Sequence, residues 1–263
     1  MKFSYGKEAV SVYRAGAGAL FAAEIRLDAF GQSFQPSYAE GDNSMVIATD
    51  SMKNFIHATA AEYDEESLEG FVELVARTFL ETYAHVESVH VAGREIAFAR
   101  AGDVVFRRVG PDRDVTELRM DGTGIRDHRS GREGLHLVKL TGSAFRGFIR
   151  DEYTTLPDAD DRPLGIQLNV YWRYANFARR VPSDGVVASL AATFDEFFNE
   201  SIQQLVHEMG VRVLDGFPDI VELSFDAENR LWDRAALPAG DGPIRIYTDP
   251  RPPYGVITLT LRR

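Results

Sequence analysis

The stretch EAVSVYRAGAGALFAAEIRLDAFGQSF, residues 8–34, indicates the kind of fold. Val, Tyr, Phe, Ala and Ile dominate residues 8–16 and 19–34, and Gly16 and Gly18 lie between the two runs. Apolar and aromatic runs on either side of a glycine-rich turn are typical of a β-hairpin. We therefore expect a long antiparallel strand pair in this part of the chain.

Two helices are expected after the hairpin. Thr49, Asp50 and Ser51 are residue types that accept backbone N–H bonds at a helix N-terminus, so a helix should begin there. Apolar residues at helical spacing continue this helix, and a second set predicts another. The first set is Met52, Phe55, Ile56 and Ala60, and the second is Leu68, Phe71, Val72, Val75, Phe79 and Tyr83.

Residues 86–98 and 103–109 return to a β-like composition, which completes a β-β-α-α-β-β order. The glycine- and charge-rich segment 110–134 is typical of a linker. We therefore expect two units, residues 1–125 and residues 126–263.

The second half of the chain repeats this order less clearly, and the repeat is inferred from element order alone. It should contain one amphipathic helix over residues 186–209. Helices on one face of antiparallel sheets define an α+β fold, and open sheet edges favour closure of a barrel between subunits. The strands are expected at 115–121, 135–149, 164–178, 220–226, 244–249 and 254–262.

Composition excludes several classes of protein. With 263 residues, of which 44% are apolar, the chain can bury real cores, and it contains no cysteine for disulfides, thiolate nucleophiles or iron–sulfur clusters. The formal net charge of -11 disfavours a nucleic-acid partner. No run approaches the roughly 18 apolar residues of a membrane span, and MKFSYGKEAV lacks a signal-peptide apolar region, so we expect a cytoplasmic protein without a membrane partner.

The six histidines do not predict a metal site. None of them pairs with another at the spacing of metal ligands within one helical turn. Solvated or packed histidines are the ordinary interpretation. They are His57, His85, His90, His128, His136 and His207.

Five segments contain combinations of residues that composition alone does not explain. Taken singly, each has an ordinary structural interpretation, such as a helix cap for Thr49 and Asp50, a core aromatic for Phe145 and a surface charge for Arg162. The segments are YGK (5–7), DNSMVIATDSMKN (42–54), SAFRGFIRDEYTTLPDADDR (143–162), SIQQL (201–205) and DAENRLW (226–232).

Together these segments closely resemble urate oxidase, the cofactor-independent uricase family, from Tyr5 to about Trp232. The most specific parts are YGK, DNSMVIATDSMKN and FRGFIRDEYTTL. The resemblance implies tandem tunnelling-fold (T-fold) units whose sheets close into barrels between subunits of a homotetramer, with active sites at the subunit interfaces. The chain ends Leu261-Arg262-Arg263 instead of in the peroxisomal tripeptide of eukaryotic relatives, which favours a bacterial cytoplasmic enzyme.

The resemblance also assigns the residues that bind the purine. Phe145 would lie flat against the ring. Arg162 and Gln203 would hold the pyrimidine side through paired donor and acceptor contacts, and the main chain at Ile202 would add one more.

The remaining implied residues handle the imidazole side of urate, oxygen and protons. Thr49 and Asp50 would come from the neighbouring subunit, at a helix N-terminus that offers N–H groups to an anion. Asn229, with the Thr49 hydroxyl, would hold oxygen above the ring. Lys7 would move protons through Thr49, so Lys7 and Thr49 are the expected catalytic residues.

The implied reaction converts urate, O2 and water to 5-hydroxyisourate and hydrogen peroxide in purine degradation, without metal or other cofactor. The chain departs from the family pattern at one point. Many members have a histidine two residues after the oxygen-pocket asparagine, but here Asn229 is followed by Arg230 and Leu231. A leucine cannot relay protons, so either ordered water replaces the histidine or the assignment of Asn229 is shifted.

Two other functions stay open at the level of sequence. Pterin-making and pterin-cleaving enzymes share the implied fold, but several of them use cysteine and others have about half this length. A binding module for urate or xanthine, which keeps Phe145, Arg162 and Gln203 without turnover, would fit the missing histidine. Oxygen consumption distinguishes the binding module from the oxidase.

Overall fold

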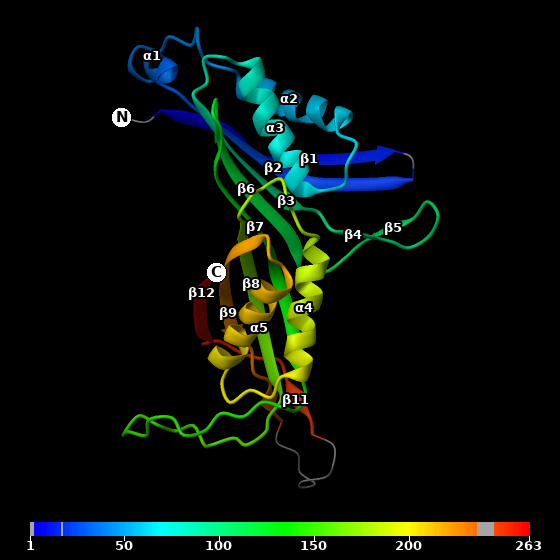
Figure 1. Ribbon diagram of the computed structural model, residues 1–263, viewed down its shortest axis with the longest axis vertical. Helices are drawn as coiled ribbons and strands as arrows, with labels where there is room; N and C mark the ends of the chain where they lie inside the picture. The colour runs from blue at the N-terminus through cyan, green and yellow to red at the C-terminus, as the bar shows by residue number, and fades with distance from the viewer. Residues whose placement is uncertain (1–2, 17, 236–244) are drawn as a thin grey trace. The chain divides into compact units, whose positions relative to one another are not determined.

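A computed structural model describes residues 3–16, 18–235 and 245–263 of the chain (Figure 1). It divides into two compact units, Met1–Gly131 and Arg132–Arg263. This division of the chain falls within strand β7 (Gly124–Lys139), which also contains the boundary expected between residues 125 and 126. Among the described residues, no helix has the length and apolar character needed to cross a membrane.

Unit 1 is an antiparallel sheet with two long helices. Its elements follow the predicted β-β-α-α-β-β order through the first two strands and the two helices. The β1–β2 hairpin and both helices are confirmed. The strands follow the order β1-β2-β3-β6-β7. The elements are β1 (Ser4–Gly16), β2 (Ala19–Phe30), a short turn of helix η1 (Gln32–Phe34) with α1 (Gln35–Ala39), α2 (Thr49–Glu62), α3 (Leu68–Thr82), β3 (Ser88–Glu95) and β6 (Arg113–Asp121).

The core of unit 1 lies between the sheet and the two helices. Alternate residues of a strand point to the same face, so Ile25 and Leu27 are fully buried while Arg26 between them is exposed. The apolar stripe of α3, including Phe71 and Val75, packs against β3 and β6. This arrangement leaves the opposite face of the sheet to polar side chains.

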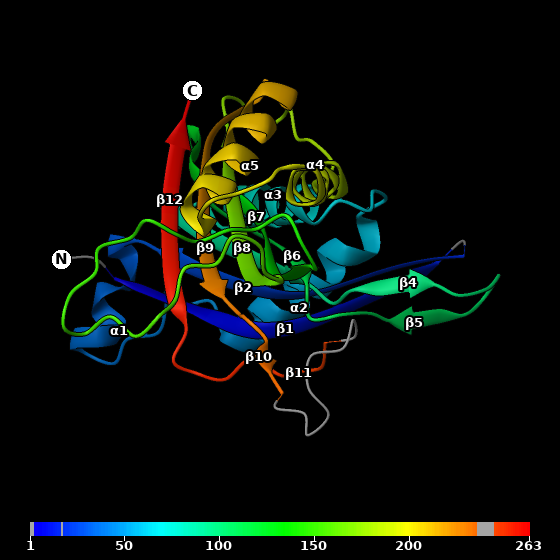
Figure 2. The ribbon, with the colours of Figure 1, turned by 90° about the horizontal axis from the view of Figure 1, so that it is seen from below.

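The expected fourth strand of unit 1 was wrong. Residues 103–109 contribute only β5 (Phe106–Arg108), which pairs with β4 (Phe98–Arg100) in a hairpin that projects as a separate ribbon (Figures 1 and 2). The fourth strand of the sheet is β6, which confirms the strand expected at 115–121 but places it in unit 1 instead of the second half. The interpretation of 110–134 as a linker was wrong here, because the charged residues of β6 alternate with Thr116, Leu118 and Met120, which are buried.

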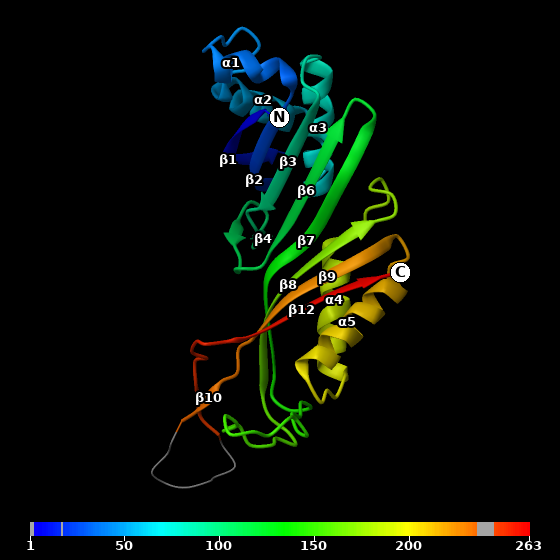
Figure 3. The same cartoon turned by 90° about the vertical axis from the view of Figure 1, so that its left-hand side faces the viewer.

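Unit 2 is also an antiparallel sheet, in the order β7-β8-β9-β12, with two helices on one face (Figure 3). The strands expected at 164–178, 220–226 and 254–262 are confirmed within a few residues. The elements are β8 (Leu164–Tyr174), α4 (Ser183–Glu196), α5 (Ile202–Gly216), β9 (Ile220–Asn229), the small pair β10 (Asp233–Arg234) and β11 (Tyr247–Thr248), and β12 (Gly255–Arg262).

Three expectations for the second half need correction. The helix predicted over 186–209 is two helices, because the chain becomes extended at Phe197 and α5 starts again after the cap at Ser201. The strand predicted over 135–149 ends at Lys139, and the residues that follow form an irregular loop. The strand predicted over 244–249 is limited to β11, and residue 244 lies outside the described residues.

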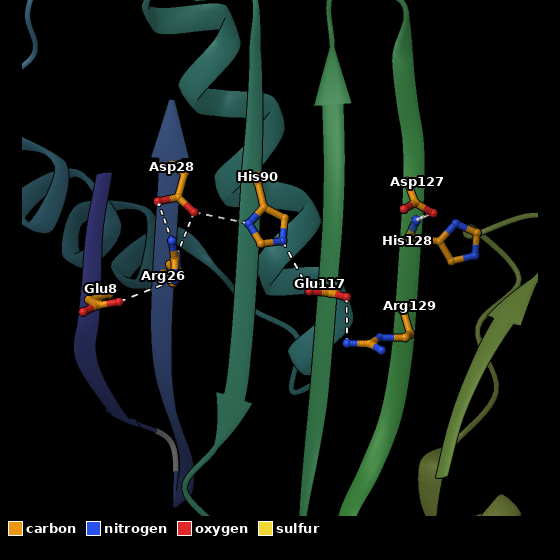
Figure 4. Close-up of polar contacts among 8 residues, drawn as sticks. All are labelled: Glu8, Arg26, Asp28, His90, Glu117, Asp127, His128 and Arg129. Carbon is orange, nitrogen blue, oxygen red and sulfur yellow. Dashed lines mark hydrogen bonds and ion pairs between the residues drawn. The ribbon is translucent and has the colours of Figure 1, made fainter. Parts of the chain in front are cut away.

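A row of alternating charges crosses the face of the unit 1 sheet that α2 and α3 leave uncovered (Figure 4). At its centre His90 approaches Asp28 Oδ2 through Nδ1 at 3.3 Å and Glu117 Oε2 through Nε2 at 3.4 Å. The two carboxylates raise the pKa of His90 to about 9, the hydrogen bond to Asp28 being the largest cause. In order across the strands the row is Glu8, Arg26, Asp28, His90, Glu117 and Arg129.

This row predicts a pH dependence of stability. The folded state binds the His90 proton more tightly than the unfolded chain, so the stabilisation is complete below the ordinary pKa of 6.5. It is lost as pH rises through about 9. Urea unfolding of both the wild type and His90→Gln across this pH range measures the effect. The free energy of unfolding of the wild type should fall as pH rises, and His90→Gln should lack this component.

The matched control is His207→Gln, which changes an exposed histidine of α5 in unit 2. This variant should keep the pH dependence of the wild type. Parallel profiles for the wild type and His90→Gln would contradict the assigned role of His90.

Candidate active site

The first group of predicted site residues lies in unit 1, where the YGK segment opens β1. The Tyr5 hydroxyl accepts a hydrogen bond from the Ile47 backbone N–H at 2.7 Å. The Tyr5 ring packs edge-on against Phe34, with centroids 4.8 Å apart. Tyr5 therefore ties the segment before α2 to the start of β1.

Gly6 and Lys7 pair with Asp28 and Leu27, near the end of β2. A side chain at position 6 has no room, because its Cβ would overlap the carbonyl oxygen of Leu27. After Lys7 the register with β2 shifts, and Ala9 adopts a positive φ of 57°. This irregularity is a β-bulge, a feature that commonly redirects side chains near functional sites. Lys7 is half-buried.

Thr49 and Asp50 form the first turn of α2, and both are exposed. The expectation that they cap the helix was wrong, because the N-cap is Ala48, which has no side-chain cap bond. Asp50 accepts a hydrogen bond from Lys53 Nζ at 2.6 Å, which lowers the pKa of its carboxyl group, and Lys7 contributes to the same shift. The first N–H groups of α2 have no partner within the helix, so this turn can receive an anion.

The second group lies in unit 2, on the loop between β7 and β8. Phe145 is held there by two backbone hydrogen bonds with Ala159, of 2.8 and 2.9 Å. The Phe148 ring stacks on the Phe145 ring, with centroids 4.9 Å apart and planes at 12°. The Phe145 ring thus already stacks face to face with a flat aromatic ring, that of Phe148.

Arg162 follows the same loop and places its guanidinium carbon 5.3 Å from the centroid of the Phe145 ring. Its Nε is buried and has no hydrogen-bond partner among the described residues. Burial lowers the pKa of the guanidinium, because it removes water from the charge. A partly desolvated guanidinium with an unused donor is suited to bind an anion.

The N-terminus of α5 presents Ile202 and Gln203. The cap at Ser201 accepts a hydrogen bond from the Gln204 N–H at 3.1 Å. The Gln204 side chain accepts one from the Glu200 N–H at 2.8 Å, so Gln204 also ties the residue before the cap to the first turn of the helix. Ile202 is buried beneath the helix, and the neighbouring Gln203 is exposed.

Asn229 is the last residue of β9 and pairs with Ile166 of β8. Its Oδ1 is buried and has no hydrogen-bond partner in the described part of the chain. Because β8 and β9 are antiparallel, Asn229 lies at the end of the sheet where Arg162 leads into β8. Only residues 217–219 separate α5 from β9, so the N-terminus of α5 lies towards this end as well.

The structure therefore gathers the predicted residues into two groups, one in each unit. The unit 1 group consists of Lys7, Thr49 and Asp50. The unit 2 group consists of Phe145, Arg162, Ile202, Gln203 and Asn229.

No neighbour of Asn229 in the chain replaces the family's relay histidine. Arg230 directs Nε at 2.8 Å and a terminal nitrogen at 2.5 Å to Glu228 Oε2. Its guanidinium carbon also lies 4.0 Å from the centroid of the Tyr254 ring. Leu231 carries no titratable group. A proton path through this segment would need water.

Sequence reasoning missed three residues that contact or support the unit 2 group. Ser143 and Phe148 lie inside the quoted motif but had no assigned role. Asn199 lies just before SIQQL and is fully buried, with hydrogen bonds that join the loop at 142–144 to the cap of α5. The pairing of Asn199 with Ser143 spans 56 residues, which no local pattern can predict.

These features define a class of site. An aromatic ring that stacks, a partly desolvated guanidinium and carboxamides at one sheet end fit a flat, anionic heteroaromatic ligand. No set of three or more His, Asp or Glu side chains in the described ranges is placed to hold a metal ion.

Comparison with known proteins agrees with this class and is more specific. The sequence model of the family described as Uricase matches residues 4–114 and 128–258. A uricase of Haloferax volcanii is 37% identical over 99% of this chain and 98% of that protein. A bifunctional uric acid degradation protein of Bacillus subtilis is 37% identical, over 91% of this chain and 53% of its own length. The chain belongs to the uricase family.

Solved structures give the same result. The crystal structure of urate oxidase from Bacillus sp. TB-90 aligns with a TM-score of 0.90 and 34% identity, over 99% of this chain and 100% of that chain. The uricase from Arthrobacter globiformis aligns with a TM-score of 0.87 and 28% identity, over 100% of this chain and 94% of that chain. The predicted α+β fold class is confirmed.

The close approach at Gly6 generates a prediction. Gly6→Ala should destabilise unit 1 by about 1–3 kcal/mol, because the added methyl group forces β1 away from β2. Chemical denaturation measures this loss. Gly16→Ala is the control, since a Cβ at the other end of β1 meets no atom within 4 Å, and it should stay within about 0.5 kcal/mol of the wild type. Equal stabilities of the two variants would contradict the steric argument.

Proposed function

We propose that this protein is a urate oxidase, which converts urate, O2 and water to 5-hydroxyisourate and hydrogen peroxide in purine degradation. Membership of the uricase family supports the proposal. The observation that carries it is the pair of buried, unpartnered atoms at one end of unit 2, Arg162 Nε and Asn229 Oδ1. An unused buried donor and acceptor are costly unless a ligand satisfies them.

Urate binding follows from the unit 2 group. Phe145 stacks on the purine in the way that the Phe148 ring stacks on Phe145 in the structure. The guanidinium of Arg162 donates to the carbonyl and ring nitrogen of the pyrimidine side. Gln203 supplies one donor and one acceptor, and the main chain at Ile202 adds a contact. Together they fix the plane and the rotation of the substrate.

Oxidation needs the unit 1 group. Thr49 and Asp50 bind the imidazole side of urate at the open first turn of α2. Lys7 accepts a urate proton through the Thr49 hydroxyl, which makes the purine electron-rich enough to reduce oxygen without a cofactor. Asn229 and Thr49 hold oxygen, and later water, above the ring. In this scheme two electrons pass from urate to O2, and water completes the hydroxylated product.

We further propose that each site combines the unit 1 group of one subunit with the unit 2 group of another. Thr49 and Asp50 support this arrangement, because both side chains are exposed. The residues that Asp50 binds, Lys53 and Asn54, lie in the same helix. Tandem T-fold units would then close into barrels in a homotetramer. We expect the assembly to work in the cytoplasm, without a nucleic-acid or membrane partner.

The experiment that tests the activity follows urate by its ultraviolet absorbance while an electrode records oxygen, with purified protein in the presence of a chelator. We expect loss of urate matched by oxygen uptake. Thermal stabilisation by urate without oxygen uptake would indicate a binding module instead, which is the alternative that Leu231 favours. The absence of both signals, urate oxidation and thermal stabilisation by urate, would refute both functions.

Shared sites predict complementation between two inactive variants. Lys7→Met should bind urate without oxidising it, and Arg162→Ala should lose binding. Mixed and reassembled at equal amounts, they should recover about a quarter of the wild-type sites, because a quarter of random pairings join two intact groups. The urate assay measures this recovery, with each variant refolded alone as the control. Hybrids no more active than their parents would contradict the shared site.

A further inference from the structure

Ser143 and Asn199 form a buried polar pair beneath the unit 2 group. Both residues are fully buried. Asn199 Nδ2 donates to the Ser143 hydroxyl at 3.1 Å and to the Ser201 carbonyl at 3.3 Å. Such a pair is costly to bury unless its hydrogen bonds are made, so it fixes the segments that carry it.

The backbone of Asn199 extends this connection. Its N–H donates to the Gly142 carbonyl at 3.2 Å, and its carbonyl accepts from the Ala144 N–H at 2.8 Å. Asn199 thus joins the loop at 142–144 to the segment between α4 and α5 through both its main chain and its side chain.

Each segment held by Asn199 leads directly to a proposed ligand residue. Ala144 precedes Phe145, and the Ser143 carbonyl accepts the backbone N–H of Arg162 at 2.9 Å. Ser201, which accepts the second Nδ2 bond through its carbonyl, is the cap of the helix that begins with Ile202 and Gln203. One carboxamide therefore connects all the groups that would grip the pyrimidine side of urate.

Two charged residues hold the same segments from outside the pair. Asp161 accepts hydrogen bonds from the Thr141 hydroxyl and from the Gly142 N–H, the latter at 2.7 Å. Lys139, a buried residue, donates from Nζ to the Phe197 carbonyl at 2.8 Å. Neither reaches the cap of α5. Arg146 places a terminal nitrogen 3.3 Å from Glu200 Oε1, just before that cap, but both side chains are exposed, so Asn199 supplies the buried connection to the helix.

Asn199 Oδ1 provides a second, independent observation. Three buried side-chain atoms lack a hydrogen-bond partner in the described part of the chain, and all three lie in unit 2. Two of them, on Arg162 and Asn229, belong to proposed ligand residues. The third is Asn199 Oδ1, an acceptor without a hydrogen-bond partner within the described residues, which an ordered water would satisfy.

We propose that Asn199 is a positioning residue of the urate site, which sets the separation between Arg162 and Phe145 on one side and the N-terminus of α5 on the other. This inference rests on the proposed function. Because Asn199 acts on binding geometry and not on Lys7 or Thr49, its loss should weaken urate binding more than it slows the oxidation of bound urate.

The test compares Asn199→Ala with the wild type. The dissociation constant for urate, measured without oxygen, should rise by about tenfold or more, with kcat changed much less. Ser143→Ala, which removes only the hydroxyl, should reproduce part of the effect. The double variant should be no weaker than Asn199→Ala alone, because both changes break one interaction.

Asn176→Ala is the matched control. Asn176 is an exposed residue of unit 2 whose Oδ1 accepts the Ala178 N–H at 3.0 Å, near the other end of β8. It should leave both constants unchanged. An unaltered dissociation constant in Asn199→Ala, with or without a fall in the unfolding midpoint, would overturn the proposal.

If Asn199→Ala does not fold, Ser143→Ala decides, and unchanged binding in that variant refutes the role. Failure of the proposed activity is distinguishable from failure of this inference. A wild type that binds urate but does not oxidise it refutes only the oxidase, and the comparison of dissociation constants still tests Asn199. A wild type that binds no urate refutes both.

Discussion

The buried hydrogen bond between Asn199 and Ser143 is the constraint on which the unit 2 site depends. Low polarity around it makes each unmade bond expensive, so the two segments have one favourable arrangement. The positions of the side chains that follow on each segment are therefore fixed as well. Phe145 and Arg162 are held on one side, and the capped N-terminus of α5 on the other. These hydrogen bonds hold the irregular loop between β7 and β8 in one position relative to α5.

Unit 1 reaches the same precision by steric means. The absence of a side chain at Gly6 lets β1 approach β2, and the bulge after Lys7 follows immediately. Tyr5 then fixes the segment before α2 through the Ile47 N–H. Strand, bulge and helix N-terminus together place Lys7, Thr49 and Asp50. Buried hydrogen bonds in unit 2 and the close approach of two backbones in unit 1 thus both fix the positions of the proposed site residues.

Errors in the sequence interpretation share one physical origin. The strand expected at 115–121 was counted with the second half, because the charged segment around it was interpreted as a linker, although Thr116, Leu118 and Met120 are buried in unit 1, where α3 packs on β6. Continuous apolar periodicity was taken as one helix over 186–209, although the pair of Asn199 with a distant serine interrupts it. Thr49 and Asp50 were expected to cap α2, but the helix starts at Thr49 itself. Each error replaced a tertiary contact with a local preference.

The sequence by itself determined the α+β class, the β1–β2 hairpin and the family, because alternation of apolar residues and motifs such as YGK are local properties. It also named the proposed ligand residues, through the resemblance. Only the tertiary structure decided that β6 completes the first sheet and that Asn199 joins the loop of Phe145 to the cap of α5. These results depend on contacts between residues far apart in the chain, which form only when both partners leave water together.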